Sequence, residues 1–218
     1  MIPLRSSEPH YTRPAATLLL IAANVLVFLY ELSLPTYALN RFIVVHGIVP
    51  DHLNLSSILT SMFIHGGFLH ILGNMWFLWI FGRGIEDLLG HGKFLFFYLA
   101  CGAAAAFAHV LLNFNSTVPT VGASGAIAGV MGAYLVKFPR ARVVTLVVII
   151  FFLTTVDLPA AFLLLYWFAI QFFNGVGSVG YSQASSGDVA WFAHVGGFIS
   201  GIVLIMLLPT RQHARWQY

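Results

Sequence analysis

Long apolar runs, separated by short polar segments, dominate this chain of 218 residues. Hydrophobic residues make up 59% of the sequence and charged residues only 8%, and the mean hydropathy is +0.88. A water-soluble domain carries about a quarter charged residues, so this chain has too few of them to cover a globule in water. The sequence therefore predicts a polytopic membrane protein, whose surroundings are the lipid bilayer.

Five apolar runs have the character of membrane spans. They cover residues 15–34, 68–81, 94–112, 122–138 and 189–208. A further apolar block, 143–173, is interrupted only by Asp157-Leu158-Pro159. As one helix this block would measure about 46 Å at 1.5 Å per residue, which exceeds a hydrocarbon core of roughly 30 Å. Because proline also discourages an unbroken helix, the block holds either one span or two.

The basic residues choose between these alternatives. If one span starts near Pro159, the chain has six spans, and Arg41 alone among the ten basic residues lies outside. Lysine and arginine collect in cytoplasmic loops, whereas two spans would move Arg211 and Arg215 outside. We therefore expect an all-α membrane protein, a single domain over residues 1–218 with six transmembrane helices and both termini in the cytoplasm. Residues 143–156 then form an inner or interfacial segment, to which we assign no conformation.

Ser124 and His194 lie inside apolar stretches, where a polar residue is costly and marks a functional site by default. A serine with a histidine is the minimum equipment for covalent hydrolysis. In the six-span topology Ser124 opens the fourth span just after an outside loop, and His194 lies five residues into the sixth. Both residues therefore lie at the outer end of the membrane at similar depth. The fourth span is also short, so its start lies below the outer surface.

Small residues recur on the faces that carry Ser124 and His194. The stripes are Ser124, Ala128 and Gly132; Gly125, Gly129 and Ala133; and His194, Gly197 and Gly201. Such spacing lets helix backbones approach closely in lipid. Plain helix packing explains each stripe taken alone. A close contact between spans four and six would also bring the imidazole to the serine hydroxyl, with the histidine acting as general base.

A second polar pair, His70 and Asn74, lies at i and i+4 near the outer end of the second span. Both side chains donate hydrogen bonds and, with the Ser124 backbone N–H at a helix start, suit an oxyanion hole. In the alternative, they are structural polar groups that hold this span to its neighbour. Further along the same span, Arg83, Glu86 and Asp87 form what we interpret as a structural polar cluster.

Three motifs in this order resemble the rhomboid family of intramembrane serine proteases, over essentially the whole chain. They are Gly122-Ala-Ser124-Gly125, Ala-His194-x-Gly-Gly and His65-x4-His70-x3-Asn74. The resemblance implies Ser124 as nucleophile, His194 as base, and His70, Asn74 and the Ser124 amide as the oxyanion hole. It implies site-shaping roles for Gly122, Gly125 and Gly197, and a dyad without a carboxylate. The substrates would be transmembrane segments of other membrane proteins, cleaved near the outer face.

The chain departs from the family pattern at the position four residues after the nucleophile. Some members carry a tyrosine there, packed on the histidine; here the residue is Ala128. Trp191 or a phenylalanine is then the candidate for steadying His194. A Trp-Arg pair often found in the first outside loop is also absent. We expect substrate entry to be lateral, past the fifth span and the Gly/Ser-rich loop 174–187.

Other classes of function fit the sequence less well. The pI is near 9.2, but the basic residues are scattered between apolar runs, which fits membrane topology and not a nucleic-acid patch. No His-Glu-x-x-His motif occurs and Cys101 is isolated, so we expect no metal and no cofactor. The rival interpretation is a non-catalytic rhomboid-like binding protein or a small transporter. Short termini without a transit peptide lead us to expect a bacterial inner membrane.

Overall fold

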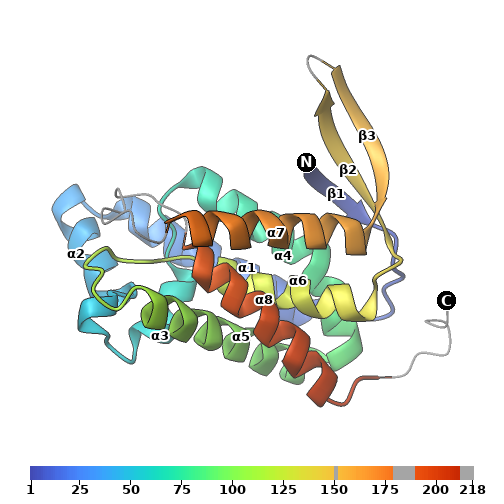
Figure 1. Ribbon diagram of the computed structural model, residues 1–218. Coiled ribbons are helices and arrows are strands. Elements are labelled where there is room, and N and C mark those ends of the chain that lie inside the picture. The colour runs from blue at the N-terminus through green and yellow to red at the C-terminus, as the bar shows by residue number, and fades with distance from the viewer. Residues whose placement is uncertain (150–151, 179–189, 212–218) are drawn as a thin grey trace.

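A computed structural model describes residues 1–149, 152–178 and 190–211 (Figure 1). The expected loop 174–187 therefore lies partly outside the described residues. The main helices are α1 (Ala15–Ser33), α2 (Thr36–His46), α4 (Phe68–Leu89), α5 (His91–Leu112), α6 (Ser124–Lys137), α7 (Ala160–Ser178) and α8 (Trp191–Leu207). Short helical turns η1 (Pro50–His52), α3 (Ser57–Thr60) and η2 (Ser61–Phe63) lie between α2 and α4. Three strands, β1 (Ile2–Ser6), β2 (Arg142–Ile149) and β3 (Phe152–Pro159), complete the fold.

The described chain is a helical, multi-pass membrane protein. By length and composition, α1, α5 and α7 can each cross a bilayer, and α4 with the turns before it, bent by 96°, is a fourth candidate. Helices α6 and α8 are apolar but shorter. Large apolar side chains such as Leu26 on α1 and Leu69 on α4 face outward, which suits lipid and not water.

Helix α6 lies in the middle of the bundle, where every residue from Gly125 to Tyr134 is buried. Its small residues permit a very close contact with α8. A Cβ added at Gly201 would lie 1.9 Å from the Gly129 carbonyl oxygen, and one added at Gly197 would lie 2.0 Å from that of Gly125. No side chain fits at such distances, so glycine is required there. Gly132, Gly197 and Gly201 thus lie at the contact between these two helices, whereas Gly125 and Gly129 face Ala105 and Cys101 of α5.

The inner end of the bundle is where the described parts of both chain ends lie (Figure 1). The Arg211 N–H donates to the Leu88 carbonyl at 2.7 Å, and the Lys93 ammonium donates to the Pro209 carbonyl at 3.2 Å. These contacts hold the segment after α8 against the junction of α4 and α5. Strand β1 is at this end too, on the same side of the bundle as the described segment after α8 (Figure 1).

Residues 143–156, to which the sequence analysis assigned no conformation, belong mostly to a β-hairpin. Strands β2 and β3 pair antiparallel from Arg142↔Pro159 to Ile149↔Phe152, and β1 adds to the other edge of β2. β-Branched side chains such as Val143 and Val144 favour this extended conformation. Helix α7 begins at Ala160, directly after Pro159, as the sequence predicted. The expected helical bundle is present, and the three-stranded sheet is an addition that the sequence analysis did not foresee.

Candidate active site

Ser124 is the first residue of α6, and the loop before it is fixed by backbone hydrogen bonds. The Gly122 N–H donates to the Ser61 carbonyl at 2.9 Å, and Thr120 pairs with Ile48 in an isolated β-bridge. Gly122 has φ 127°, a left-handed conformation that favours glycine. The loop therefore delivers the chain to α6 in one defined direction and presents the serine at the start of the helix.

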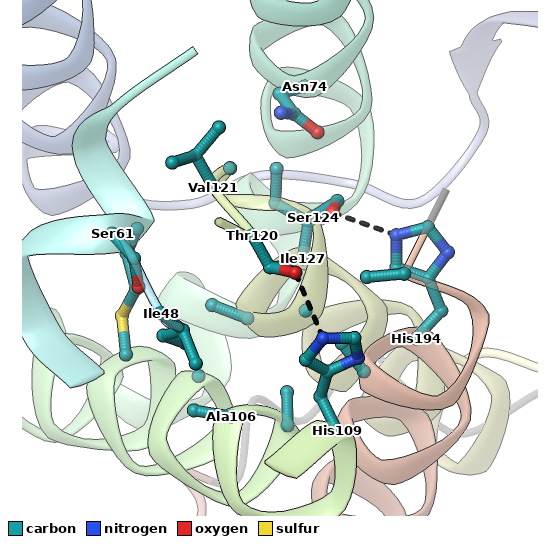
Figure 2. A pocket seen from close by; sticks show the side chains of 18 of the residues that line it. Ile48, Ser61, Asn74, Ala106, His109, Thr120, Val121, Ser124, Ile127 and His194 are labelled. Atoms are coloured by element: carbon teal, nitrogen blue, oxygen red, sulfur yellow. Dashed lines mark hydrogen bonds between the residues drawn. The ribbon is translucent and has the colours of Figure 1, made fainter. Parts of the chain in front are cut away.

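His194 lies in the first turn of α8, and the close contact between α6 and α8 brings its ring to the serine. The imidazole Nε2 is 2.8 Å from the Ser124 hydroxyl oxygen (Figure 2). His194 is itself buried. A hydroxyl within hydrogen-bond reach of an imidazole nitrogen is the geometry in which histidine takes a proton from serine.

His70 and Asn74 line the opposite wall, on the outer half of α4. A Cβ added at Gly122 would lie 2.7 Å from His70 Nε2 and 3.6 Å from Asn74 Nδ2, so both nitrogens touch the loop before Ser124. The Gly66 N–H donates to His70 Nδ1 at 3.4 Å, which leaves the hydrogen of a neutral ring on Nε2. Asn74 Nδ2 is buried and has no hydrogen-bond partner among the described residues. Two N–H donors thus lie beside the loop that precedes Ser124.

All four side chains line one cavity of about 1050 Å³. Its lining also includes the loop residues Ser116, Pro119 and Thr120. Irregular backbone within a membrane protein is tolerated where it is buried in protein or lines a wet cavity. A cavity of this size, with polar side chains on its walls, has room for water beside Ser124.

Comparisons with known proteins identify the family. A family model described as the rhomboid domain matches residues 52–211. This chain belongs to the rhomboid family.

Individual relatives cover a smaller part of their own chains. The mitochondrial presenilin-associated rhomboid-like protein of Homo sapiens is 34% identical over 133 residues, which is 56% of this chain and 33% of that protein. The rhomboid protease GluP of Bacillus subtilis is 34% identical over 128 residues, 56% of this chain and 24% of GluP. The mitochondrial RHOMBOID-like protein 6 of Arabidopsis thaliana is 28% identical over 163 residues, which is 73% of this chain and 46% of that protein. The matched part is less than half the length of each of these relatives.

In this rhomboid, α7 contacts the histidine. The Gln171 side-chain oxygen lies 2.7 Å from His194 Nδ1, and the Trp167 ring lies 5.8 Å from the imidazole, centroid to centroid. Trp191, which the sequence analysis considered for this role, also contacts the ring, edge to face at 6.5 Å. Gln171 was missed, although a single polar residue in the apolar stretch 160–173 was the signal that could have found it.

Two further histidines lie near the cavity. His109 lines it, and its Nε2 is 2.9 Å from the Thr120 hydroxyl, so it is a hydrogen-bonded residue of α5 (Figure 2). His65 is buried behind His70, with the two rings 5.1 Å apart. Its backbone N–H donates to the Glu31 carboxylate of α1. His65 therefore supports the position of His70 and does not line the cavity.

Proposed function

We propose that this chain is an intramembrane serine endopeptidase that cleaves transmembrane segments of other membrane proteins near the outer membrane face. The observation that carries the proposal is the contact of 2.8 Å between the Ser124 hydroxyl and His194 Nε2, on the wall of a cavity inside a helical membrane protein. Membership of the rhomboid family, which includes the protease GluP, supports the same chemistry.

In the proposed mechanism, His194 Nε2 removes the hydroxyl proton while the Ser124 oxygen attacks the scissile carbonyl carbon. The carbonyl oxygen becomes an oxyanion, which accepts hydrogen bonds from the Ser124 backbone N–H, Asn74 Nδ2 and His70 Nε2. The intermediate collapses as the imidazolium gives its proton to the leaving amine. Water from the cavity then attacks the carbonyl carbon of the acyl-enzyme while His194 Nε2 takes a proton from it. The imidazolium gives this proton to the Ser124 oxygen as the acyl–oxygen bond breaks, which releases the acid and restores the serine.

The proposed topology has six spans, α1, α4, α5, α6, α7 and α8, within a single domain over residues 1–218. Helix α6 has 14 residues, about 21 Å at 1.5 Å per residue. It is thus shorter than a hydrocarbon core of roughly 30 Å. In the proposed topology α6 therefore begins, at Ser124, below the outer surface, and the cavity above Ser124 admits water. Both termini are proposed to face the cytoplasm. A bacterial cell membrane is the proposed location; the relatives described above include one bacterial and two mitochondrial proteins.

The proposed substrate is a transmembrane helix that unwinds locally, because helical hydrogen bonds shelter a peptide bond from attack. Weak helix formers such as glycine and proline therefore mark good substrates. The proposed entry route is lateral, between α4 and α7, whose residues Phe77 and Trp167 both line the cavity. Joining α4 to α7 with a thiol-cleavable linker should stop cleavage of a membrane substrate until the linker is reduced. Full cleavage by the linked protein would exclude this route.

A fluorophosphonate probe tests the proposal directly, because it reacts covalently with an activated serine. Purified wild-type protein should be labelled, and Ser124→Ala and His194→Ala should lose both labelling and cleavage of membrane substrates. Ser33→Ala is the matched control, since Ser33 is exposed at the end of α1 and donates only to the Tyr30 carbonyl. Wild-type protein that neither labels nor cleaves would instead support the rival function, a non-catalytic binding protein or a small transporter.

A further inference from the structure

The contact between Gln171 and His194 joins two helices that the mechanism above does not connect. Gln171 lies on α7 and is only 6% exposed, and its partner His194 is 8% exposed. Their hydrogen bond of 2.7 Å is therefore shielded from solvent. A buried amide side chain in an apolar helix is costly unless it is hydrogen-bonded, so this bond holds Gln171 and the imidazole together.

The bond also selects the state of the histidine. For His194 Nε2 to take the serine proton, that nitrogen must present a lone pair, and in a neutral ring the hydrogen is then on Nδ1. The Gln171 oxygen accepts that N–H. The amide oxygen thus favours the tautomer that a general base requires, and when the ring becomes an imidazolium it continues to accept from Nδ1.

We propose that Gln171 is a positioning residue that takes the place of the third member of a catalytic triad. In this arrangement a neutral amide orients His194 and fixes its tautomer from the neighbouring helix α7. The inference rests on the proposed protease function and goes beyond it, because a dyad alone needs no side chain on α7.

The surroundings of His194 explain why an amide serves here. Ala128 on α6 is too small to hold the imidazole, so the steadying groups come from α7, with Trp167 one turn before Gln171. An amide accepts the N–H without adding a charge to a buried, apolar setting, where an unpaired carboxylate is expensive. A glutamine at this place therefore costs less than an aspartate would.

The location of Gln171 has a consequence for control of the site. Helix α7 packs mainly on α8 and less on α6, whereas α6 and α8 make the closest contact in the molecule. When α7 moves aside, the Gln171–His194 bond breaks while Ser124 and His194 stay on their helices. His194 is then held in its reactive tautomer only when α7 is in its closed position. Opening of the proposed entry route between α4 and α7 is therefore coupled to the orientation of the general base.

Three substitutions test the role of Gln171 by full kinetics on a membrane substrate. Gln171→Leu removes the acceptor at similar size and should lower kcat by about 10²-fold, the scale of a misplaced catalytic group, with KM within about twofold of wild type. Gln171→Glu restores an acceptor and should recover most of kcat. Its carboxylate also stabilises the imidazolium, so the acidic limb of the pH–kcat profile should move to higher pH. Asn40→Leu is the matched control, because Asn40 is an exposed amide on α2 that does not line the cavity, and it should behave like wild type.

The outcomes separate this inference from the function on which it rests. If wild-type protein shows no Ser124-dependent cleavage, the proposed function fails. If wild type cleaves and Gln171→Leu has the same kcat, or if Gln171→Glu is as slow as Gln171→Leu with an unmoved pH profile, only the role of Gln171 is overturned. Melting temperatures measured in detergent identify any loss of kcat that comes from unfolding, and the pH profile of Gln171→Glu decides the question in a variant that keeps the hydrogen bond.

Discussion

The polar side chains at the two ends of α4 differ in whether they have hydrogen-bond partners. At the inner end, Glu86 accepts from the Ala16 and Thr17 N–H groups at 2.8 Å and lies 2.6 Å from His91 Nδ1. Asp87 accepts from the N–H groups of Tyr11 and Thr12 at 2.9 Å. At the outer end, Asn74 has a buried amide nitrogen with no protein partner among the described residues.

This difference distinguishes polar side chains of α4 that stabilise the fold from a polar side chain that is available to bind a ligand. The carboxylate of Glu86 satisfies two N–H groups in the first turn of α1, which would otherwise lack partners, and its charge suits the positive end of that helix. An unsatisfied buried donor costs about 1–3 kcal/mol, and such a cost is tolerated where the missing partner is a ligand. The end of α4 that carries Glu86 and Asp87, here called the saturated end, holds the helices together. The end that carries Asn74, the unsaturated end, is where the proposed oxyanion would bind.

Breaking the saturated end should have the largest effect, and it should be on stability. Glu86→Ala leaves the Ala16 and Thr17 N–H groups without their acceptor, in a site where Glu86 is 0% exposed. A buried donor left unsatisfied costs about 1–3 kcal/mol, so the two N–H groups together cost about 2–6 kcal/mol. We expect a corresponding loss of unfolding free energy in detergent, while the kcat of the remaining folded molecules changes little.

Asp157→Ala provides the control for this prediction. Asp157 is an exposed carboxylate on β3, and surface substitutions change stability by no more than about 0.5 kcal/mol. A Glu86→Ala protein that is as stable as Asp157→Ala would refute the structural role of the inner cluster. So would a folded Glu86→Ala protein that has lost its catalytic rate.

Much of the helical bundle could be predicted because its signals are local. The apolar runs at 15–34 and 94–112 correspond closely to α1 and α5. The spacing of Gly197 and Gly201 also predicted which face of α8 meets α6, since residues on one helix face recur at fixed intervals. The contact between Ser124 and His194 follows from that packing.

The missed features depend on contacts between distant segments. Strand β1 pairs with β2 about 140 residues later in the chain, for example Ile2 with Leu146. The five residues of β1 are too few to show a periodic pattern from which this partner could be predicted. Residues 143–156 are rich in β-branched side chains, but the apolar character of the block does not distinguish a hairpin from a span. Gln171 is different, because its polarity within an apolar stretch was visible, whereas its partner became known only from the packing of α7 on α8.

The unsaturated end of α4 gives the complementary prediction, on rate and not on stability. Asn74→Ala removes a buried donor that has no protein partner among the described residues, so the unfolding free energy should stay the same or rise slightly. If Asn74 Nδ2 stabilises the oxyanion, kcat should fall by about 10²-fold with little change in KM, as on removal of one donor from an oxyanion hole. The loss should be smaller if His70 and the Ser124 N–H compensate. Ser57→Ala is the control, because the Ser57 hydroxyl on α3 is buried and donates to the Asn54 carbonyl; its cost should be in stability. A wild-type kcat in Asn74→Ala, or a loss of stability like that of Ser57→Ala, would show that the two ends of α4 do not differ as argued, and would make Asn74 a structural residue.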